Sequence, residues 1–331
     1  MSPPLLEVTG LSRSVPVGGF FSRSRRTLLN GVSFTLERGE IVALVGESGS
    51  GKSTLARVLA RLDAPDGGSL RLGGEDVLAG EKGGASLAYR GRVQMVFQDP
   101  FASLNPVHTV AHHLERPLLR HGRATRAELQ TRVHALLESV GLTPGESFAR
   151  RFPHELSGGQ RQRVAVARAL AVEPDVIIAD EPTSMLDVST RREVLQLLRG
   201  LTQERGIGIL FITHDLASAR HLADRVMVLY AGRVVESGRT ADVLAAPRHP
   251  YTRLLRSAVP DGADFLRAPL PVKAAAGPIP LTGCAFAPRC PHADARCHAT
   301  VPPEHHPAAD HLVRCHLESS KGVLDNAAVP S

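Results

Sequence analysis

The sequence predicts an α/β fold that is built around a largely parallel β-sheet. Short apolar runs of strand length alternate with longer segments of helical spacing over most of the chain, which is the pattern of α/β domains. A glycine-rich turn follows one of these apolar runs directly and leads into a helical segment. The 331 residues, 43% hydrophobic and 22% charged, suffice for one large globular domain and a small appendage.

The predicted elements follow one another with short turns between them. Strands are expected over residues 5–8, 33–36, 40–45, 69–72, 176–179, 207–213 and 225–230. Helices are expected over residues 53–62, 126–140, 159–171, 189–205 and 216–223, with a turn over residues 64–68 (APDGG).

Two changes of character divide the chain. Helical spacing dominates residues 101–162 and interrupts the strand–helix alternation, so we interpret about 99–164 as a helical subdomain within a domain over residues 1–258. Beyond about residue 260 the chain is rich in Pro, Ala, His and Cys and shows little periodicity. We therefore predict a distinct C-terminal region over residues 259–331.

The charge and hydropathy of the chain restrict its location. The formal net charge of +6 suits an anionic membrane face or a nucleic acid, and it is equally compatible with neither. No apolar run approaches the ~20 residues that span a bilayer, and residues 1–10 do not resemble a signal peptide. We expect a cytoplasmic protein whose contact with a membrane comes through a partner.

Residues 46–54 match a phosphate-binding loop. They read GESGSGKST, the pattern G-x-x-x-x-G-K-[ST], between an apolar strand and a helix, and this context disfavours a chance glycine-rich turn. Backbone N–H groups and the helix dipole would face the phosphates, Lys52 would reach the β- and γ-phosphates, and the Ser53 hydroxyl would ligate Mg²⁺. The predicted nucleotide-binding residues are Gly46, Glu47, Ser48, Gly49, Ser50, Gly51, Lys52, Ser53 and Thr54.

A second strand ends in two carboxylates. Residues 176–181 read VIIADE, so Asp180 lies at the carboxyl edge of the predicted sheet, where it can hold Mg²⁺. Glu181 is the next residue and can activate water as a general base. An ordinary solvated strand end would look the same in isolation, but the phosphate loop upstream favours the functional interpretation. Together the two motifs predict a Mg²⁺-dependent ATPase or GTPase.

Residues 156–160 resemble the signature motif of ABC ATPases. They read LSGGQ and are followed by RQRVAVARAL, so that free N–H groups at a helix N-terminus can face an anion. The resemblance implies a RecA-like core with a helical subdomain, and ATP held between this motif and the phosphate loop of a second subunit. The residues concerned are Leu156, Ser157, Gly158, Gly159 and Gln160.

Other parts of the chain resemble further elements of that family. Gln98 (VFQDP) resembles the Q-loop glutamine that touches Mg²⁺ and water, and His214 (FITHD) resembles the switch histidine that contacts the γ-phosphate. Asp187 (MLD) resembles the D-loop aspartate, although Met185 stands where the family usually has Ala. The resemblance thus implies Glu181, His214 and Gln98 as catalytic residues, and Ser53, Gln98 and Asp180 as the Mg²⁺ ligands.

The residue that stacks on adenine is the main departure from the family. An aromatic side chain usually precedes the Pro-Val pair, but Val15 occupies that place here, before Pro16 and Val17. Phe20 or Phe21 could substitute, and simple packing is the alternative for both.

Three segments resemble the ATPases of oligopeptide and dipeptide importers. They are QDPFASLNPV (98–107), RHPYTRLL (248–255) and the cysteine-containing tail GCAFAPRCPHADARC. The resemblance implies an ATP-hydrolysing subunit on the cytoplasmic side of the membrane, working with a second ABC ATPase (identical or paralogous), two transmembrane permease subunits and a periplasmic or extracellular peptide-binding protein. The permease contact is expected near residues 98–105.

Other transport and non-transport roles stay open. Nickel or another small solute is the alternative cargo, and an exporter subunit is a further alternative that the importer-like tail disfavours. A soluble ABC ATPase of DNA repair or translation is a more distant one, because such proteins usually carry coiled-coil arms or two cassettes. We expect no nucleic-acid partner.

The C-terminal region holds all four cysteines of the chain. Their spacing, C-x₅-C-x₆-C-x₁₇-C, could complete a zinc site or hold an iron–sulfur cluster, although it lacks the C-x₂-C pairs of zinc ribbons. The resemblance to peptide importers implies a [4Fe–4S] cluster, while zinc and reduced thiols are the alternatives. His292, His298 and His316 could compete as ligands, and solvent exposure is the alternative for them. The candidate ligands are Cys284, Cys290, Cys297 and Cys315.

Overall fold

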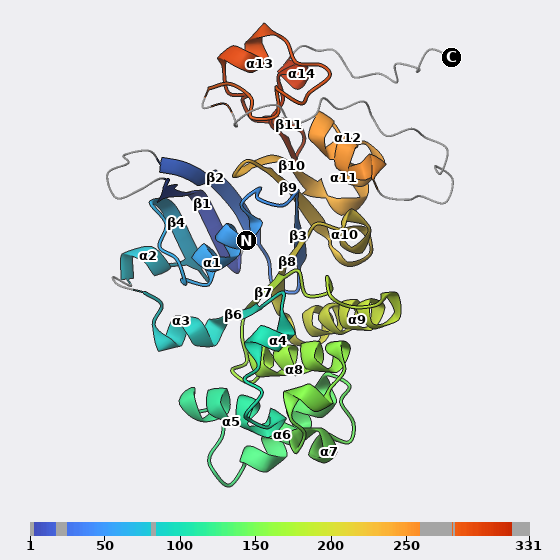
Figure 1. Ribbon diagram of the computed structural model, residues 1–331. Helices are drawn as coiled ribbons and strands as arrows, with labels where there is room; N and C mark the ends of the chain where they lie inside the picture. Colours follow the sequence, from blue (N-terminus) through green and yellow to red (C-terminus); the bar gives the residue numbers. More distant parts are fainter. Residues whose placement is uncertain (1–2, 18–24, 81–83, 259–279, 281, 320–331) are drawn as a thin grey trace.

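The computed structural model describes residues 3–17, 25–80, 84–258, 280 and 282–319. A large mixed sheet runs through the middle of the molecule, as Figure 1 shows, with a smaller sheet on one side, a helical part below and the C-terminal region above. Among the described residues, none of the helices combines the length and apolar character that a membrane crossing requires.

The large sheet has the strand order β11-β12-β10-β9-β3-β8-β7-β6. Its parallel part consists of β6 (Val93–Val96), β7 (Val176–Asp180), β8 (Gly208–Thr213), β3 (Ile41–Val45) and β9 (Arg225–Tyr230). Three antiparallel strands continue it: β10 (Arg233–Arg239), β12 (His311–Val313) and β11 (His305–Ala308). Strands β3, β7 and β8 are buried along their whole length, which explains their continuous apolar sequences.

Side chains that alternate along β3 face two different cores. Val42 and Leu44 pack with helix α1 (Lys52–Leu59) and with the smaller sheet. Ile41, Ala43 and Val45 pack on the opposite face, with helices α8 (Gly158–Leu170), α9 (Val188–Arg205) and α10 (Leu216–Leu222). The period of two residues in the strand therefore places one layer of structure on each side of the sheet.

The smaller sheet is antiparallel and has the order β2-β1-β4-β5. Its strands are β1 (Leu6–Pro16), β2 (Arg25–Leu36), β4 (Gly67–Leu72) and β5 (Glu75–Asp76). Two short helices, α2 (Val77–Gly80) and α3 (Leu87–Arg92), connect it to β6. The sequence analysis did not anticipate β6, α2 or α3, because these elements are only four to six residues long and show little periodicity.

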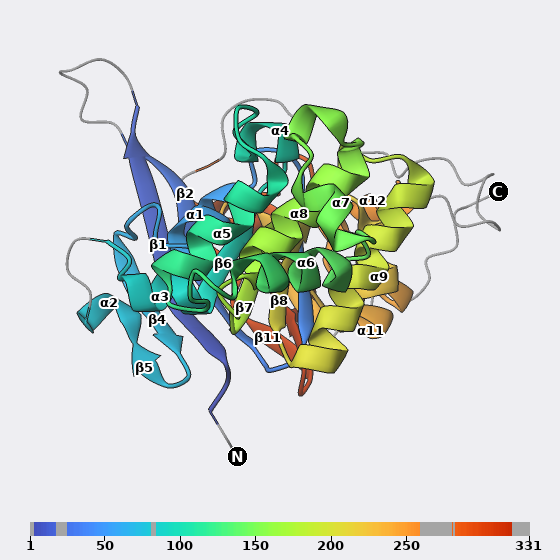
Figure 2. The ribbon, with the colours of Figure 1, turned by 90° about the horizontal axis from the view of Figure 1, so that it is seen from below.

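Helices fill the segment between β6 and β7, as expected. They are α4 (Pro100–Ser103), α5 (Val110–Arg120), α6 (Leu129–Ser139), α7 (Gly145–Ala149), the 3₁₀ helix η1 (Pro153–Glu155) and α8. Figure 2, seen from below, shows α5, α6 and α8 lying together in front of the large sheet. The helical part is thus an insertion into the α/β core.

The C-terminal region is built onto the large sheet. The chain after β10 first forms α11 (Thr240–Ala245) and α12 (Pro250–Ser257), and the C-terminal region then adds α13 (Ala295–Ala299) and α14 (His316–Ser319). Strand β12 of this region pairs with β10 through Glu236 and Val313. The weak periodicity of this region did not reveal β11 and β12. The region therefore shares a sheet with the core.

Glu236 is a fully buried carboxylate at this junction. It accepts hydrogen bonds from the backbone N–H groups of Arg248 (2.9 Å) and His249 (3.0 Å) and contacts His311 Nε2 at 2.8 Å. Burial alone would raise the pKa of Glu236, but these hydrogen bonds outweigh it and lower the pKa. His249 is itself buried, and this burial lowers its pKa to about 4. Glu236 thus joins β10, α12 and β12.

Glu236→Gln is expected to lower the free energy of unfolding by about 2 kcal/mol at pH 7. The amide that replaces the carboxylate has only one acceptor oxygen, so it cannot accept all the buried hydrogen bonds that Glu236 accepts. Since the folded pKa lies below the unfolded value of about 4.3, the carboxylate stabilises the fold fully above that value and loses its effect as the pH falls further. Urea unfolding at neutral and acid pH measures both effects. The exposed Glu204→Gln is the control, with a change within about 0.5 kcal/mol. A stability gap that does not shrink in acid would contradict this account.

Candidate functional site

The loop after β3 turns sharply into helix α1. Gly51 precedes the helix with φ 110°, and a Cβ built there would lie 2.5 Å from the Leu28 carbonyl oxygen, so only glycine fits. Lys52 begins the helix, is buried, and donates from Nζ to the carbonyl oxygens of Gly46 (2.8 Å) and Glu47 (3.0 Å). Burial lowers the pKa of Lys52, and the nearby carboxylates of Glu181, Asp180 and Glu47 oppose that shift. The amino group of Lys52 is therefore held across the mouth of the loop.

Strand β7 brings Asp180 to the same place. The Ser53 hydroxyl donates to Asp180 Oδ1 at 3.4 Å, and burial raises the pKa of Asp180. A hydroxyl and a carboxylate at the end of a parallel strand are the hard oxygen donors that Mg²⁺ prefers. These residues fit a magnesium ion.

Glu181 is the centre of a polar cluster. Gln98 Nε2 donates to Glu181 Oε2 at 3.0 Å, and His214 Nδ1 lies 3.3 Å from the same oxygen. Glu181 has φ 46°, a left-handed conformation that is uncommon outside glycine, and its N–H donates to the Ile212 carbonyl at 2.9 Å. The backbone thus directs this side chain toward two residues that come from the ends of β6 and β8. Three predicted catalytic residues meet at one carboxylate oxygen.

The residues 156–160 lie at the start of helix α8. Ser157 caps the helix, because its Oγ accepts from the Gln160 N–H (3.2 Å) and Gln160 Oε1 accepts from the Ser157 N–H (3.1 Å). A Cβ at Gly159 would lie 2.0 Å from Thr190 Cγ2, so glycine permits close contact with α9. In the part of the chain that the structure describes, no hydrogen bond connects this motif to the phosphate loop.

Asp187 caps helix α9. Its carboxylate accepts hydrogen bonds from the Ser189 hydroxyl (2.6 Å), the Thr190 N–H (2.9 Å) and the Thr190 hydroxyl (2.8 Å), which hold its pKa well below the usual range. Two large apolar side chains beside it, Met185 and Val188, are 56% and 81% exposed. The turn before α9 therefore presents an apolar surface next to a fixed carboxylate.

The structure describes only part of the segment that was considered for the adenine contact. Val15 lies in β1, is partly buried and pairs with Arg26 of β2. Phe20 and Phe21, the predicted substitutes, lie outside the described residues.

The four cysteines lie together in the C-terminal region without metal-site geometry. Burial, and to a smaller extent the other three thiols, raise the pKa of Cys315 to about 12, and the Cys284 N–H donates to the Cys297 carbonyl at 2.7 Å. These cysteines form no disulfide. Among the described residues, no three His, Cys, Asp or Glu side chains have a geometry that could hold a metal ion. The structure therefore gives the predicted iron–sulfur cluster no support, and His316 contacts the Thr300 carbonyl instead (2.9 Å).

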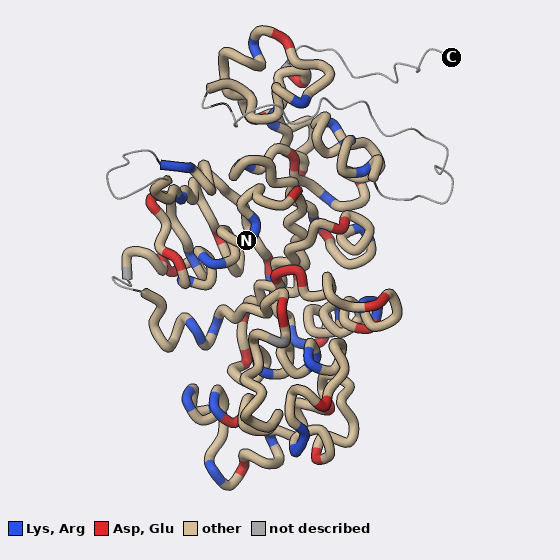
Figure 3. Tube along the Cα trace, viewed as in Figure 1, with Lys and Arg blue, Asp and Glu red and all other residues tan. Residues whose placement is uncertain are grey.

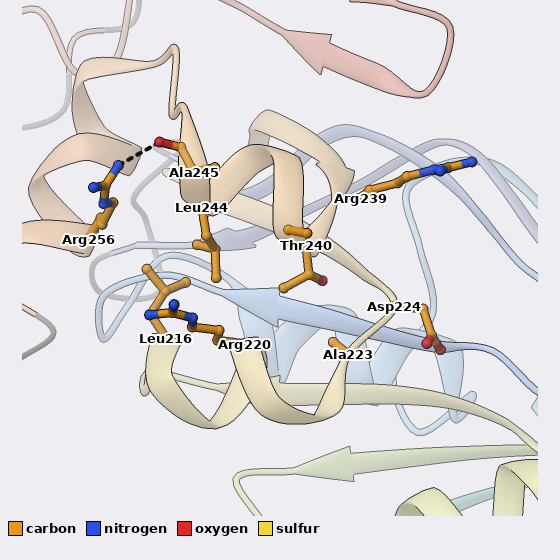
Figure 4. Close-up of a pocket in the computed structure, with 10 residues that line it drawn as sticks. Leu216, Arg220, Ala223, Asp224, Arg239, Thr240, Leu244, Ala245 and Arg256 are labelled. Atoms are coloured by element: carbon orange, nitrogen blue, oxygen red, sulfur yellow. Dashed lines mark hydrogen bonds between the residues drawn. The ribbon is translucent and has the colours of Figure 1, made fainter. Parts of the chain in front are cut away.

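A cavity of about 550 Å³, whose lining residues are drawn in Figure 4, is lined by none of residues 46–54. It lies where α10 and α11 come together, and none of its lining residues belongs to the predicted site. Arg256 at its edge donates to the Ala245 carbonyl at 2.9 Å, and Arg239 lies 3.8 Å from the Asp310 carboxylate. The convergence of polar groups favours the phosphate loop over this cavity as the reactive site.

Sequence reasoning missed two residues at the loop. The Glu47 N–H donates to Tyr251 Oη at 2.7 Å, and Arg289 pairs with the Glu47 carboxylate. Tyr251 lies within RHPYTRLL and Arg289 within the cysteine segment, so both segments had been noted without a role for these side chains.

Comparison with known proteins identifies the class and then the family. The family described as ABC transporter matches residues 29–184, and the family described as Oligopeptide/dipeptide transporter, C-terminal region, matches residues 235–297. The dipeptide transport ATP-binding protein DppF of Haemophilus influenzae is 43% identical over 304 residues, which cover 90% of this chain and 92% of that protein. The oligopeptide transport ATP-binding protein AppF of Bacillus subtilis is 42% identical over 329 residues, which cover 95% and 98%.

Solved structures support the same class. The dimeric, post-hydrolysis ATP-binding cassette MJ0796 bound to ADP and Pi is 31% identical with a TM-score of 0.62, covering 71% of this chain and 98% of its own. The cassette cbiO1 of Clostridium perfringens, part of the transporter complex cbiONQ, is 30% identical with a TM-score of 0.63, covering 73% and 91%. Fold and site thus define an ATPase of the ATP-binding cassette class. Within that class, the chain belongs to the family of the dipeptide and oligopeptide transport ATP-binding proteins.

Proposed function

We propose that this chain is the ATP-hydrolysing subunit of a membrane ABC importer for dipeptides and oligopeptides. The observation that carries the proposal is similarity over 90% and 95% of the chain to proteins named for transport of these substrates. Residues 1–258 are the proposed nucleotide-binding domain, with a helical subdomain at about 99–164, and residues 259–331 are the C-terminal region of the peptide-importer group.

Residues 46–54 form the proposed ATP site. Their backbone N–H groups and the N-terminus of α1 would bind the phosphates, and Lys52 would leave its carbonyl partners to contact the β- and γ-phosphates. Ser53, Asp180 and Gln98 are the proposed Mg²⁺ ligands. When bound by these residues, Mg²⁺ would supply positive charge that offsets the charge of the phosphates.

Glu181 is the proposed general base. Its Oε2 would take a proton from the water that attacks the γ-phosphorus, while Gln98 and His214 hold the carboxylate in place from two sides. His214 would in addition contact the γ-phosphate. The bond to the leaving ADP oxygen breaks as the water oxygen bonds to phosphorus, so the site contributes positioning and electrostatics without a covalent intermediate.

A second ATPase subunit, identical or related, would complete the site. The motif over residues 156–160 would present the N–H groups of Gly158 and Gly159 to the γ-phosphate bound by the partner. The exposed apolar side chains of Met185 and Val188 support an interface beside Asp187, because such side chains cost free energy when left in water.

The other proposed partners are two transmembrane permeases and a periplasmic or extracellular peptide-binding protein. The subunit would lie at the cytoplasmic side of the inner or plasma membrane, with residues 98–105 near the permease, because Gln98 links that segment to Glu181. A nucleic-acid partner is not proposed. Figure 3 shows Lys and Arg spread over the whole molecule and interspersed with Asp and Glu.

A [4Fe–4S] cluster on Cys284, Cys290, Cys297 and Cys315 remains a proposal that rests on the sequence resemblance alone, with Zn²⁺ and reduced thiols as alternatives. Iron, sulfide and zinc analysis of the chain purified without oxygen distinguishes the three. A cluster would give about four iron atoms per chain.

Uptake of labelled peptides by cells tests the proposed cargo. Deletion of this chain is expected to reduce dipeptide or oligopeptide uptake at least about tenfold if no second importer replaces it, and the wild-type chain, but not Glu181→Gln, should restore it. Nickel uptake is measured in the same cells. Loss of nickel uptake with intact peptide uptake would change the cargo and leave the ATPase role standing.

A further inference from the structure

The C-terminal region contacts the phosphate loop through Arg289. The guanidinium makes two parallel hydrogen bonds with the Glu47 carboxylate, Nη1 to Oε2 at 2.7 Å and Nη2 to Oε1 at 2.9 Å. The hydrogen bonds with Glu47 raise the pKa of Arg289 further above its usual value. Glu47 is the second residue of the loop, and 242 positions separate the two residues. A two-point ion pair of this kind fixes orientation as well as charge.

Aromatic side chains hold Arg289 in place. Its Cζ lies 5.9 Å from the ring centre of Tyr230 and 5.7 Å from that of Phe286. Phe286 is buried and contacts Tyr230 and Tyr251 at centroid distances of 5.2 and 5.4 Å. The arginine side chain is only 18% exposed, so it is a packed group rather than a mobile surface cation.

Every polar group of Glu47 has a partner. Its N–H donates to Tyr251 Oη (2.7 Å), its carbonyl accepts from Lys52 Nζ (3.0 Å), and its carboxylate binds Arg289. Of these partners, Tyr251 belongs to α12 and Arg289 to the cysteine segment, immediately before Cys290. Two segments that follow β10 therefore fix the first turn of the loop.

We propose that Arg289 is a positioning residue for the nucleotide site, and that through it the C-terminal region sets the ATP affinity of the cassette. The proposal rests on the proposed function, since it assumes that residues 46–54 bind ATP. Two physical effects support it. A loop already held in its binding shape needs less ordering when ligand arrives. Arg289 also neutralises the Glu47 carboxylate, which would otherwise repel a triphosphate.

Binding of a fluorescent ATP analogue to the full-length chain, with ATP as competitor, tests the proposal. Arg289→Ala is expected to raise the Kd for ATP about five- to tenfold. Arg289→Lys should give a Kd between those of the wild type and Arg289→Ala, because lysine keeps the charge but cannot make the two parallel hydrogen bonds of the guanidinium. Arg296→Ala is the matched control: Arg296 lies in the same segment and pairs with Asp294 instead (3.0 Å). Its Kd should change less than about twofold.

A double-mutant cycle and thermal unfolding separate positioning from folding. In a Glu47→Gln background, Arg289→Ala should cost less than about half of its effect on the wild type, because the partner charge is gone. The KM for ATP should rise while kcat stays within about twofold. Unchanged affinity in Arg289→Ala and Arg289→Lys, or equal losses in Arg296→Ala with parallel falls in Tm, would overturn the proposal. A wild-type chain that binds no ATP would overturn the proposed function instead.

Discussion

Glu181→Gln is expected to reduce ATP turnover at least about 100-fold while ATP binding stays within a few-fold of wild type. The amide keeps the size of the side chain but cannot accept a proton from water. The contact with Gln98 at 3.0 Å keeps the side chain near its place, so the loss should fall on kcat. Phosphate release by the assembled transporter and ATP binding by the chain measure the two effects separately.

Glu173→Gln provides the matched control. Glu173 also has a left-handed backbone (φ 56°), but it pairs with Arg123 at 3.1 Å and contacts no predicted site residue. Turnover should change less than about twofold. If Glu181→Gln kept more than about a tenth of the wild-type turnover, the role of Glu181 as base would be wrong.

Lys52→Ala is expected to weaken ATP binding about 100-fold, or roughly 3 kcal/mol, and to abolish measurable turnover. Lys52 is the sole lysine among the described residues, and it is buried at the mouth of the loop. Its removal leaves the triphosphate without the positive charge that the Lys52 side chain provides beside the loop. Equilibrium binding of ATP measures the loss.

Arg57→Ala tests whether that loss is specific. Arg57 lies on the same helix, and it pairs with Asp63 at 2.8 Å on the surface, so its removal changes the charge of α1 without touching the loop. Affinity within about twofold of wild type is expected. Equal weakening by both substitutions would indicate that the net charge of the helix, rather than Lys52, binds the phosphates.

The grouping of these polar side chains at one edge of the sheet could be predicted because each part is a contiguous motif. The phosphate loop follows a fully buried strand, and VIIADE ends another, so the parallel sheet alone places Lys52, Asp180 and Glu181 at one edge. Gln98 and His214 came from family resemblance, and the structure brings both to Glu181. These positions depend on local sequence and on strand direction, which a single sequence carries.

The contacts of the C-terminal region could not be predicted in the same way. The pairing of Arg289 with Glu47 depends on how the chain folds between two residues that lie 242 positions apart, and β12 pairs with β10 over only two residues. No periodic pattern records such pairings. The division of the chain near residue 258 therefore did not indicate that the second part completes the sheet of the first and holds its phosphate loop.

Purification of this chain from membranes, followed by an ATPase assay with candidate peptides, tests the central claim most directly. We expect two permeases and a second cassette subunit to copurify, and ATPase activity to rise when peptide-loaded binding protein is added. Recovery of a soluble nucleic-acid-binding partner instead, without permeases and without stimulation by peptide, would contradict the importer and leave only the ATP-binding cassette fold.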